Sequence, residues 1–437
     1  MGWLDFFETK TELKHAFGRG TNANLSKDEE DLFNKSYEAF ESKDTVTAYA
    51  YFLESLQNYS NEHANENIII QKKDGELHFE IYQGSAKITG TITKENLHAQ
   101  AILVKKSSAN VALKRLILER NYQFTYCYYF SDDEHIKLKL SMDNITMSPQ
   151  KIFFPLREIA LNADFDKEYI KCDFPDITLE DIAHIHTLDE EELSLKYRFM
   201  HEWMDEVNTK ISSLPSNDNA GMQSFLLLYL LFKIDYLLVP KFSIYKKSTK
   251  KIQDYFSDEN LTVEAKNDEL REYITELQEM PYEVFKTNFY NAKYTFNPTE
   301  RASYEEIDIF ITESLSKVRW YKSNRYNQII PTMYKYIAMY LLYNYGLHPV
   351  TRELLHTLTE IQNPAFFNAM GYTPLYDAQN ATFAKRAIVS KIENIIAPYQ
   401  SRFKMLKPFG DKLNFTSLNE FSNSFYLQLK NLDYEEI

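Results

Sequence analysis

The chain has 437 residues, a length that accommodates about two or three domains. Hydrophobic residues make up 44% and charged residues 26%, which is typical of a folded protein with a large core. The 63 acidic and 49 basic residues give a net charge of -14. Because such a chain repels nucleic-acid phosphates and anionic lipids, we expect no nucleic-acid partner and no membrane partner.

Glycine is scarce, with 10 residues in the whole chain. Phosphate-binding loops need closely spaced glycines, and the sequence holds no G-x-x-x-x-G-K-[ST] and no G-x-G-x-x-G pattern. The G-x-S-x-G pattern of α/β-hydrolases is also absent. These absences argue against the common nucleotide-binding and hydrolase classes, and we expect no cofactor.

The chain contains two cysteines, Cys127 and Cys172. Two thiols form neither a disulfide framework nor a four-cysteine zinc site, so we expect reduced thiols in a reducing compartment. The first residues include acidic side chains and lack the apolar stretch of a signal peptide. These features favour a cytoplasmic protein.

Residues 1–27 form an amphipathic N-terminal segment ahead of the first domain. Its large apolar side chains are Trp3, Leu4, Phe6, Phe7, Leu13 and Phe17. A helix this short is marginal on its own in water, so we expect its apolar side to dock on the rest of the chain or on a second chain. Docking on a membrane surface is the weaker alternative, because acidic side chains offset the basic ones.

Residues 28–175 have the pattern of an α+β domain. Ser26, followed by acidic residues, predicts a helix start, and the apolar spacing up to residue 56 fits one long helix or two. From residue 68 apolar and polar residues alternate, with Asp74-Gly75 as a hairpin turn. This alternation predicts an antiparallel meander with one buried face and one polar face.

The polar side of the expected sheet is a possible docking surface, with plain solvent exposure or coverage by C-terminal helices as alternatives. Its predicted members are His78, Glu80, Thr89, Thr91, Thr125, Tyr129, Lys137 and Lys139.

A helix at 109–121, an aromatic strand at 123–130, a strand at 134–140 and a helix that starts at Ser148 complete the block. In this order of elements, residues 28–172 resemble the type III secretion chaperone-like fold and the YbjN-type domains of bacteria. The resemblance implies a protein-binding module without catalysis, often dimeric. It covers about a third of the chain, which is far longer than a small secretion chaperone.

After residue 175 the strand pattern ends, and residues 176–437 are predicted to form an all-α domain. The expected helices are 178–212, 221–239, 263–279, 303–321, 329–345, 349–361, 380–395 and 415–430. The apolar run 225–239 contains Lys233 and Asp235 and is shorter than the roughly 20 residues of a membrane span. We expect a buried core helix there, with a transmembrane helix as the alternative.

Four groups of residues in this region are candidates for a binding site. His201 and Asp205 occupy the two ligand positions of a zincin-like helix, and His184 and His186 lie two residues apart, a spacing that does not chelate from a helix. We expect His201 and Asp205 to lie on a polar helix face, and His184 and His186 to lie in a solvated acidic stretch. Lysines 246, 247, 250 and 251 are expected to form a solvated surface, and the tyrosines between 334 and 345 to pack in a core or interface.

We therefore nominate no catalytic, cofactor-binding or metal-binding residue, and we expect no stoichiometric transition metal. The sequence favours a bacterial, non-enzymatic protein-interaction or chaperone-like protein that binds a protein partner or itself. The alternative is an enzyme or small-ligand-binding protein with a site between its two domains.

Overall fold

The computed structural model describes residues 15–18, 26–57, 67–215 and 219–436. The chain divides into two compact units. Among the described residues, the first unit holds 15–18, 26–57, 67–187 and 290–297, and the second holds 188–215, 219–289 and 298–436. The α+β prediction is confirmed, because an antiparallel sheet with helices precedes a mostly helical region.

The first unit is built on a six-stranded antiparallel sheet with the strand order β1-β2-β3-β4-β6-β5. The strands are β1 (Ile68–Lys73), β2 (Glu76–Gln83), β3 (Ala86–Ile92), β4 (Asn96–Lys105), β5 (Cys127–Ser131) and β6 (His135–Asp143). Asp74 and Gly75 both have positive φ, as a type I′ hairpin turn requires, so the predicted turn is confirmed.

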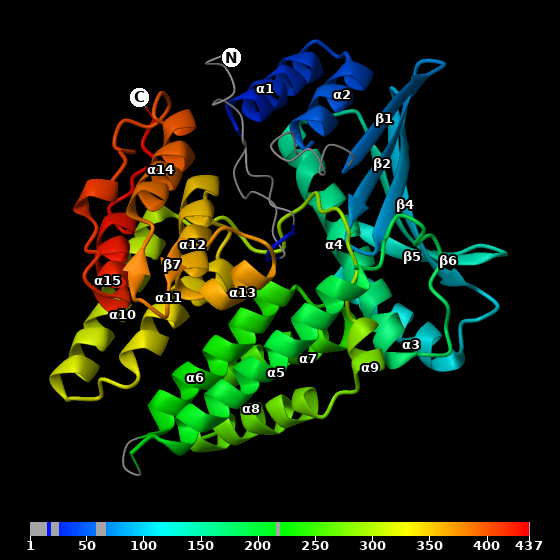
Figure 1. Cartoon of the computed structure of the whole chain (residues 1–437). Helices are drawn as coiled ribbons and strands as arrows, with labels where there is room; N and C mark the ends of the chain where they lie inside the picture. Colours follow the sequence, from blue (N-terminus) through cyan, green and yellow to red (C-terminus); the bar gives the residue numbers. More distant parts are fainter. Residues whose placement is uncertain (1–14, 19–25, 58–66, 216–218, 437) are drawn as a thin grey trace, which may run out of the picture. The chain divides into compact units, whose positions relative to one another are not determined.

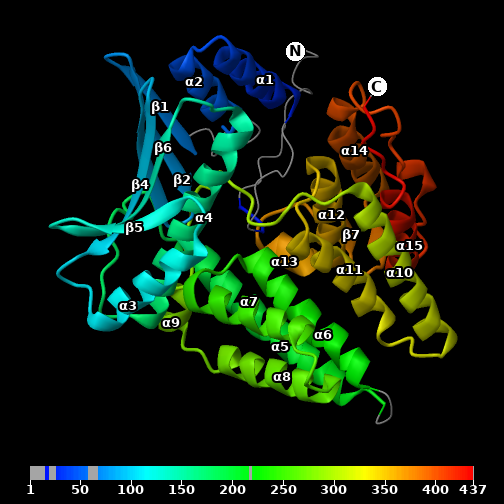
Figure 2. The ribbon, with the colours of Figure 1, turned by 180° about the vertical axis from the view of Figure 1, so that it is seen from behind.

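Four helices complete this unit, and α2 and α4 lie against one face of the sheet (Figures 1 and 2). They are α1 (Lys27–Glu41), α2 (Thr45–Ser55), α3 (Val111–Arg120), which continues into the 3-10 turn η1 (Asn121–Gln123), and α4 (Pro149–Asp173). The predicted stretch up to residue 56 is thus two helices, separated at Lys43, which has positive φ. Ser26 caps α1 with a complete capping box.

The core of the first unit lies between this sheet face and α2 and α4. The inward side chains of the strands, such as Leu77, Ile81, Ile88 and Leu138, are completely buried there. Each such side chain contributes about 1.5–3 kcal/mol by leaving water. The core therefore packs against one face of the sheet, and the opposite face does not contribute to this core.

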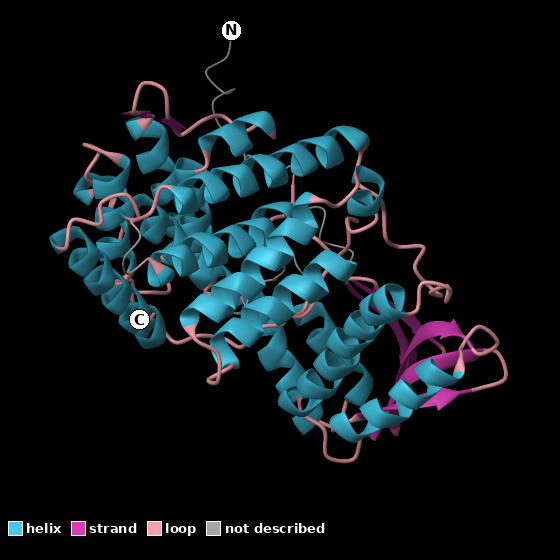
Figure 3. Cartoon of the chain, turned by 90° about the horizontal axis from the view of Figure 1, so that it is seen from below, coloured by secondary structure: helices cyan, strands magenta, loops and turns pink. Residues whose placement is uncertain are grey.

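The second unit is mostly helical, and Figure 3 shows that the long strands all lie in the first unit. Its helices are α5 (Glu190–Ser212), α6 (Ala220–Lys233) with the π-helical turn η2 (Ile234–Leu238), α7 (Phe242–Ser257), α8 (Val263–Gln278), α9 (Tyr282–Lys286), α10 (Tyr304–Ser323), α11 (Ile330–Asn344), α12 (Pro349–Gln362), α13 (Pro364–Ala369), α14 (Lys385–Ile396), the 3-10 turns η3 (Ala397–Tyr399) and η4 (Gly410–Lys412), and α15 (Leu418–Leu429). A minimal hairpin, β7 (Tyr376–Asp377) and β8 (Thr382–Phe383), interrupts them.

The apolar run predicted at 225–239 lies in α6 and η2. Within the described residues, 220–238 is the one helical segment long and apolar enough to cross a membrane by length and composition, and 89% of its most apolar window is buried inside the structure. Helices α5, α7, α8 and α11 pack around α6. A core helix satisfies the same length and composition test, so this segment is weak evidence for a membrane span.

Three predictions about this region differ from the structure. The helix expected at 178–212 begins only at Glu190, and the residues before Leu188 belong to the first unit. The first unit also includes Tyr290–Asn297, which the sequence pattern assigned to the helical domain. Helix α7 was not predicted, because its lysines and serines were interpreted only as a solvated surface.

The amphipathic segment 1–27 falls almost entirely outside the described residues. Of its large apolar side chains, Phe17 is described and is buried. The docking of the remaining residues stays a prediction.

Candidate functional site: the open face of the N-terminal sheet

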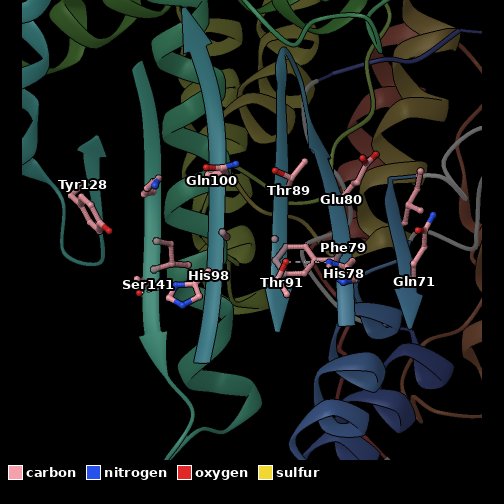
Figure 4. A pocket seen from close by; sticks show the side chains of 15 residues that line it. Gln71, His78, Phe79, Glu80, Thr89, Thr91, His98, Gln100, Tyr128 and Ser141 are labelled. Carbon is pink, nitrogen blue, oxygen red and sulfur yellow. Dashed lines mark hydrogen bonds between the residues drawn. The ribbon is translucent and has the colours of Figure 1, made fainter. Parts of the chain in front are cut away.

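The candidate site is the sheet face opposite the core of the first unit. Alternation along the strands sends every second side chain to this face, and the antiparallel register, regular except for a bulge between Ile102 and Val104 of β4, aligns these side chains into rows that cross the sheet. Figure 4 shows two such rows from the open side. Together they line a hollow of about 680 Å³.

We call the first row the glutamate–lysine row. In the order of the strands across the sheet it consists of Ile69, Glu80, Thr89, Gln100, Lys139 and Tyr128. We call the second row the histidine row, and it consists of Gln71, His78, Thr91, His98 and Ser141.

Hydroxyl–imidazole contacts join neighbouring strands in the histidine row. Thr91 Oγ1 lies 3.2 Å from His78 Nδ1, and Ser141 Oγ lies 2.9 Å from His98 Nδ1. A carboxylate oxygen of Glu76 lies 3.7 Å from His78 Nε2. In a catalytic series of a hydroxyl, an imidazole and a carboxylate, the hydroxyl is the nucleophile, the imidazole is its base and the carboxylate orients the imidazole.

This series, however, is open to water. The side chains of His78 and Glu76 are 43% and 45% exposed. Catalytic stabilisation of a developing charge depends on preorganised donors in a site that excludes water. The histidine row is therefore best described as a set of hydrogen-bonding groups on a surface.

The charges of the glutamate–lysine row stand three strands apart. Glu80 accepts a hydrogen bond from the Tyr82 hydroxyl at 2.5 Å and lies 3.7 Å from the ammonium of Lys87, which also pairs with Asp181. The ammonium of Lys139 lies 3.9 Å from the centre of the Phe130 ring. Three strand spacings amount to about 14 Å, so Glu80 and Lys139 do not pair within one chain.

The prediction of the polar face is correct for six residues and wrong for two. His78, Glu80, Thr89, Thr91, Lys137 and Lys139 share the open face, as the register shows. Tyr129 points to the opposite side, where its hydroxyl donates to Asp166. Thr125 lies before β5, and its N–H donates to Glu158 at 2.8 Å.

The cause of both errors is the register of β5. Cys127 is buried and pairs with the buried Leu140, so Tyr129, two residues further on, is also directed inward. Tyr128 and Phe130 consequently face outward, 43% and 40% exposed. The inward face of β5 thus carries a cysteine and a tyrosine and not the most apolar residues of the segment.

Sequence reasoning missed His98, Gln100, Tyr128, Ser141 and two residues of the edge strand, Ile69 and Gln71. For His98 and Gln100 a signal existed, because they alternate with Leu97, Ala99 and Ala101, which were assigned to the core. The alignment of rows across strands carries no signal in a single sequence, since it depends on the pairing register.

The residues weighed as metal ligands are occupied by other contacts. In the second unit, the ring nitrogens of His201 lie 2.9 Å from the Tyr197 carbonyl and 3.1 Å from the Gln278 carbonyl, and Asp205 accepts from the Gln278 amide at 2.7 Å. In the first unit, His184 Nε2 lies 3.2 Å from the Gly84 carbonyl. Within the described ranges, no three His, Cys, Asp or Glu side chains are grouped to hold a metal.

The lysine cluster and the tyrosine-rich helix have structural roles in the second unit. Lys247 and Lys251 on α7 pair with Glu276 and Glu269 on α8, at 2.8 and 3.2 Å. Tyr334 and Tyr336 on α11 are buried, and Tyr336 packs edge-to-face against Phe225. These contacts account for both features without a ligand.

The second unit has a smaller hollow of about 280 Å³ between α10, α11 and α15. Its rim carries Arg319, Lys322 and Lys430 together with Glu420, which pairs with Lys322 at 3.3 Å. Lys430 pairs with Asp308 at 3.1 Å. Its charges are largely paired within the unit, so the open sheet face remains the stronger candidate.

No family model matches the chain, and no curated protein matches its sequence. The resemblance to secretion chaperones and YbjN-type domains therefore stays an expectation.

Proposed function

We propose that this is a non-enzymatic, cytoplasmic interaction protein with a chaperone-like role, and that it binds a protein partner through the open face of its N-terminal sheet. The observation that supports this function is the pairing register of the six strands in the N-terminal sheet. It places amide, hydroxyl, imidazole and phenol groups in even rows over six strands, on a face directed away from the core. The alternative of an enzyme or a small-ligand-binding protein stays a prediction.

The chemistry of this face suits a protein surface. Protein interfaces combine apolar contact area with about one hydrogen bond per 100–200 Å², and tyrosine is enriched in them. Here the hydrogen-bonding rows are continued at the β5 edge by Tyr126, Tyr128 and Phe130, each about 40% exposed. The hollow is lined by residues from all six strands, in contrast to the deep, mostly apolar cavities that hold small ligands.

The test is site-specific photo-crosslinking in cells that produce the full chain. A benzophenone side chain replaces Thr89, at the centre of the open face, or Thr146, an exposed residue of a loop outside the sheet. We expect a protein adduct of defined mass from position 89 and no such adduct from position 146. Equal adducts from both positions, or none from position 89, would contradict the proposal.

A further inference from the structure

The side chains of the glutamate–lysine row are complementary to those of a second, identical row placed opposite it in reversed order. From one edge of the sheet it runs Ile69, Glu80, Thr89, and from the other edge it runs Tyr128, Lys139, Gln100. The two ends are apolar, the next positions carry opposite charges, and the central pair consists of a hydroxyl and an amide. Such a row matches a copy of itself that lies over it in the opposite order.

A two-fold axis parallel to the strands, between β3 and β4, produces this arrangement. Rotation by half a turn about that axis brings two copies of the sheet face to face, keeps the height along the strands and reverses the strand order. Glu80 of one copy then meets Lys139 of the other, twice, and Thr89 meets Gln100 on both sides of the axis. A two-fold interface needs this kind of self-complementary surface.

The histidine row is complementary to itself under the same rotation. His78 meets Ser141 of the second copy, and Thr91 meets His98, so each imidazole faces a hydroxyl. These are the same group types that already pair within the chain at 2.9 and 3.2 Å. The match ends one row further, where Glu76 would face Asp143 at the end of the sheet.

From this double match we infer that the partner of the open face is a second copy of this chain, packed sheet against sheet about a two-fold axis. The inference rests on the proposed function, since it names the occupant of the same face. Lys139 provides a second argument. Among the residues that the structure describes, it has no carboxylate partner, and the second copy supplies one in Glu80.

Charge reversal tests the pairing, with the mass of the full chain measured by light scattering after size exclusion. The wild type is expected at twice 51.6 kDa. Glu80→Lys alone and Lys139→Glu alone each create two like-charge contacts, so each variant is expected at the single-chain mass. Mixing the two variants restores opposite charges across the axis, and the mixture is expected to recover the double mass.

The double variant Glu80→Lys/Lys139→Glu is also expected to be dimeric, because the two charges exchange places. Matched controls on the exposed side of α3, Glu119→Lys and Lys114→Glu, should leave the mass of the wild type unchanged. Since Glu80 also accepts a hydrogen bond from Tyr82, the melting temperature of each variant is measured to separate unfolding from dissociation.

Two results overturn the inference. One is a wild-type chain of single mass, and the other is a pair of single variants that stay monomeric when folded and mixed. These results are distinguishable from failure of the proposed function. If position 89 crosslinks to a different protein, the open face remains a docking surface and the second copy is excluded. If position 89 yields no specific adduct, the proposed function itself fails.

Discussion

At the scale of single residues, Lys167 is the most unusual group in the first unit. It lies on α4 and is completely buried, and its ammonium donates to the Ser85 carbonyl at 3.2 Å and to the Asp181 carbonyl at 3.0 Å. Burial lowers the pKa of Lys167 to about 8, and this loss of hydration outweighs the nearby carboxylates of Asp181 and Asp164. The lysine ties α4 to the turn between β2 and β3 and to the loop that holds Asp181.

This lowered pKa predicts a dependence of stability on pH. Below pH 8 both the folded and the unfolded chain bind the proton of Lys167, so the folded state carries the full desolvation cost. Between about pH 8 and 10.5 the unfolded chain binds more protons than the folded one, so the contribution of Lys167 to the free energy of unfolding rises with pH.

We therefore expect the difference in unfolding free energy between wild type and Lys167→Met to shift by about 1–3 kcal/mol in favour of the wild type between about pH 8 and pH 10. Urea unfolding at the two pH values measures this difference. Lys171→Met, exposed on the same helix, should show a constant difference and serves as the control. If Lys167→Met also gave a constant difference, the lysine would bind its proton equally in both states.

At the scale of elements, the edge strand β5 is protected by side chains. Glu158 on α4 accepts the N–H groups of Thr125, Tyr126 and Cys127 at 2.8, 2.7 and 2.9 Å. Asn121 accepts the N–H of Tyr129 at 2.8 Å. Unpaired N–H groups on an edge strand recruit other strands, so these contacts protect β5 from pairing with a strand of another chain.

Glu158→Ala should therefore destabilise the first unit and expose its edge. Three N–H groups lose a charged acceptor, at an expected cost of about 1–3 kcal/mol. We expect a lower urea midpoint and, on storage, growth of particles larger than those of the wild type, measured by light scattering. Glu119→Ala, at an exposed position on α3, is the matched control. If the variant kept both the urea midpoint and the particle mass of the wild type, water would satisfy these N–H groups as well as the Glu158 carboxylate does.

The sheet was largely predictable because alternation repeats over β2, β3 and β4, where Leu77, Ile88 and Ala101 mark the buried side. In β5 the same reasoning chose the wrong side. Phe124, Tyr126, Tyr128 and Phe130 alternate along the segment, so the pattern marked their side as the buried one. Burial of Cys127 and the contact of Tyr129 with Asp166 set the opposite register. Local pattern predicts a strand, and tertiary contacts decide its orientation when both faces are apolar.

The helical elements show the same limit. The acidic residues 189–192 do begin a helix, with Asp189 as its N-cap, but the stretch before them was joined to it. That stretch instead folds along the first unit, where Leu179 bridges to Val104 and His186 to Asn291. Helix α7 was missed although Ile244, Ser248 and Ile252 form a buried side at helical spacing, because the prediction considered only its lysines. The pairing of Lys247 and Lys251 with acidic residues of α8 comes from tertiary structure. The rows of side chains that form the candidate site likewise cannot be predicted from the local sequence pattern, because they depend on how the strands pair.

At the scale of the whole molecule, the first unit is discontinuous in sequence. Residues 290–297 return to it after the chain has formed α5 to α9. Gln83 Oε1 accepts the N–H groups of Thr295 and Phe296 at 3.0 and 2.8 Å, and Phe296 is 1% exposed in the core of the first unit. Nothing in the eight residues themselves reveals this, because their partners lie far away in the sequence, and Gln83 lies more than 200 positions earlier.

This discontinuity predicts that residues 26–187 alone form an incomplete unit. His186 and Asn291 exchange two backbone hydrogen bonds, at 3.2 and 2.7 Å, so the chain ends at residues 187 and 290 lie side by side. A short glycine linker can therefore replace residues 188–289 and join the first unit into one continuous chain that ends at residue 297.

The joined chain should unfold at a higher urea concentration than residues 26–187 alone. Burial of Phe296 contributes about 1.5–3 kcal/mol, and the two N–H groups that Gln83 accepts add to it. Phe296→Ala in the joined chain should remove most of the gain, which separates the packing of this side chain from the effect of added length. Equal urea midpoints for the joined chain and for residues 26–187 would show that 290–297 rests on the first unit without stabilising it, and the unit would then end at Thr187.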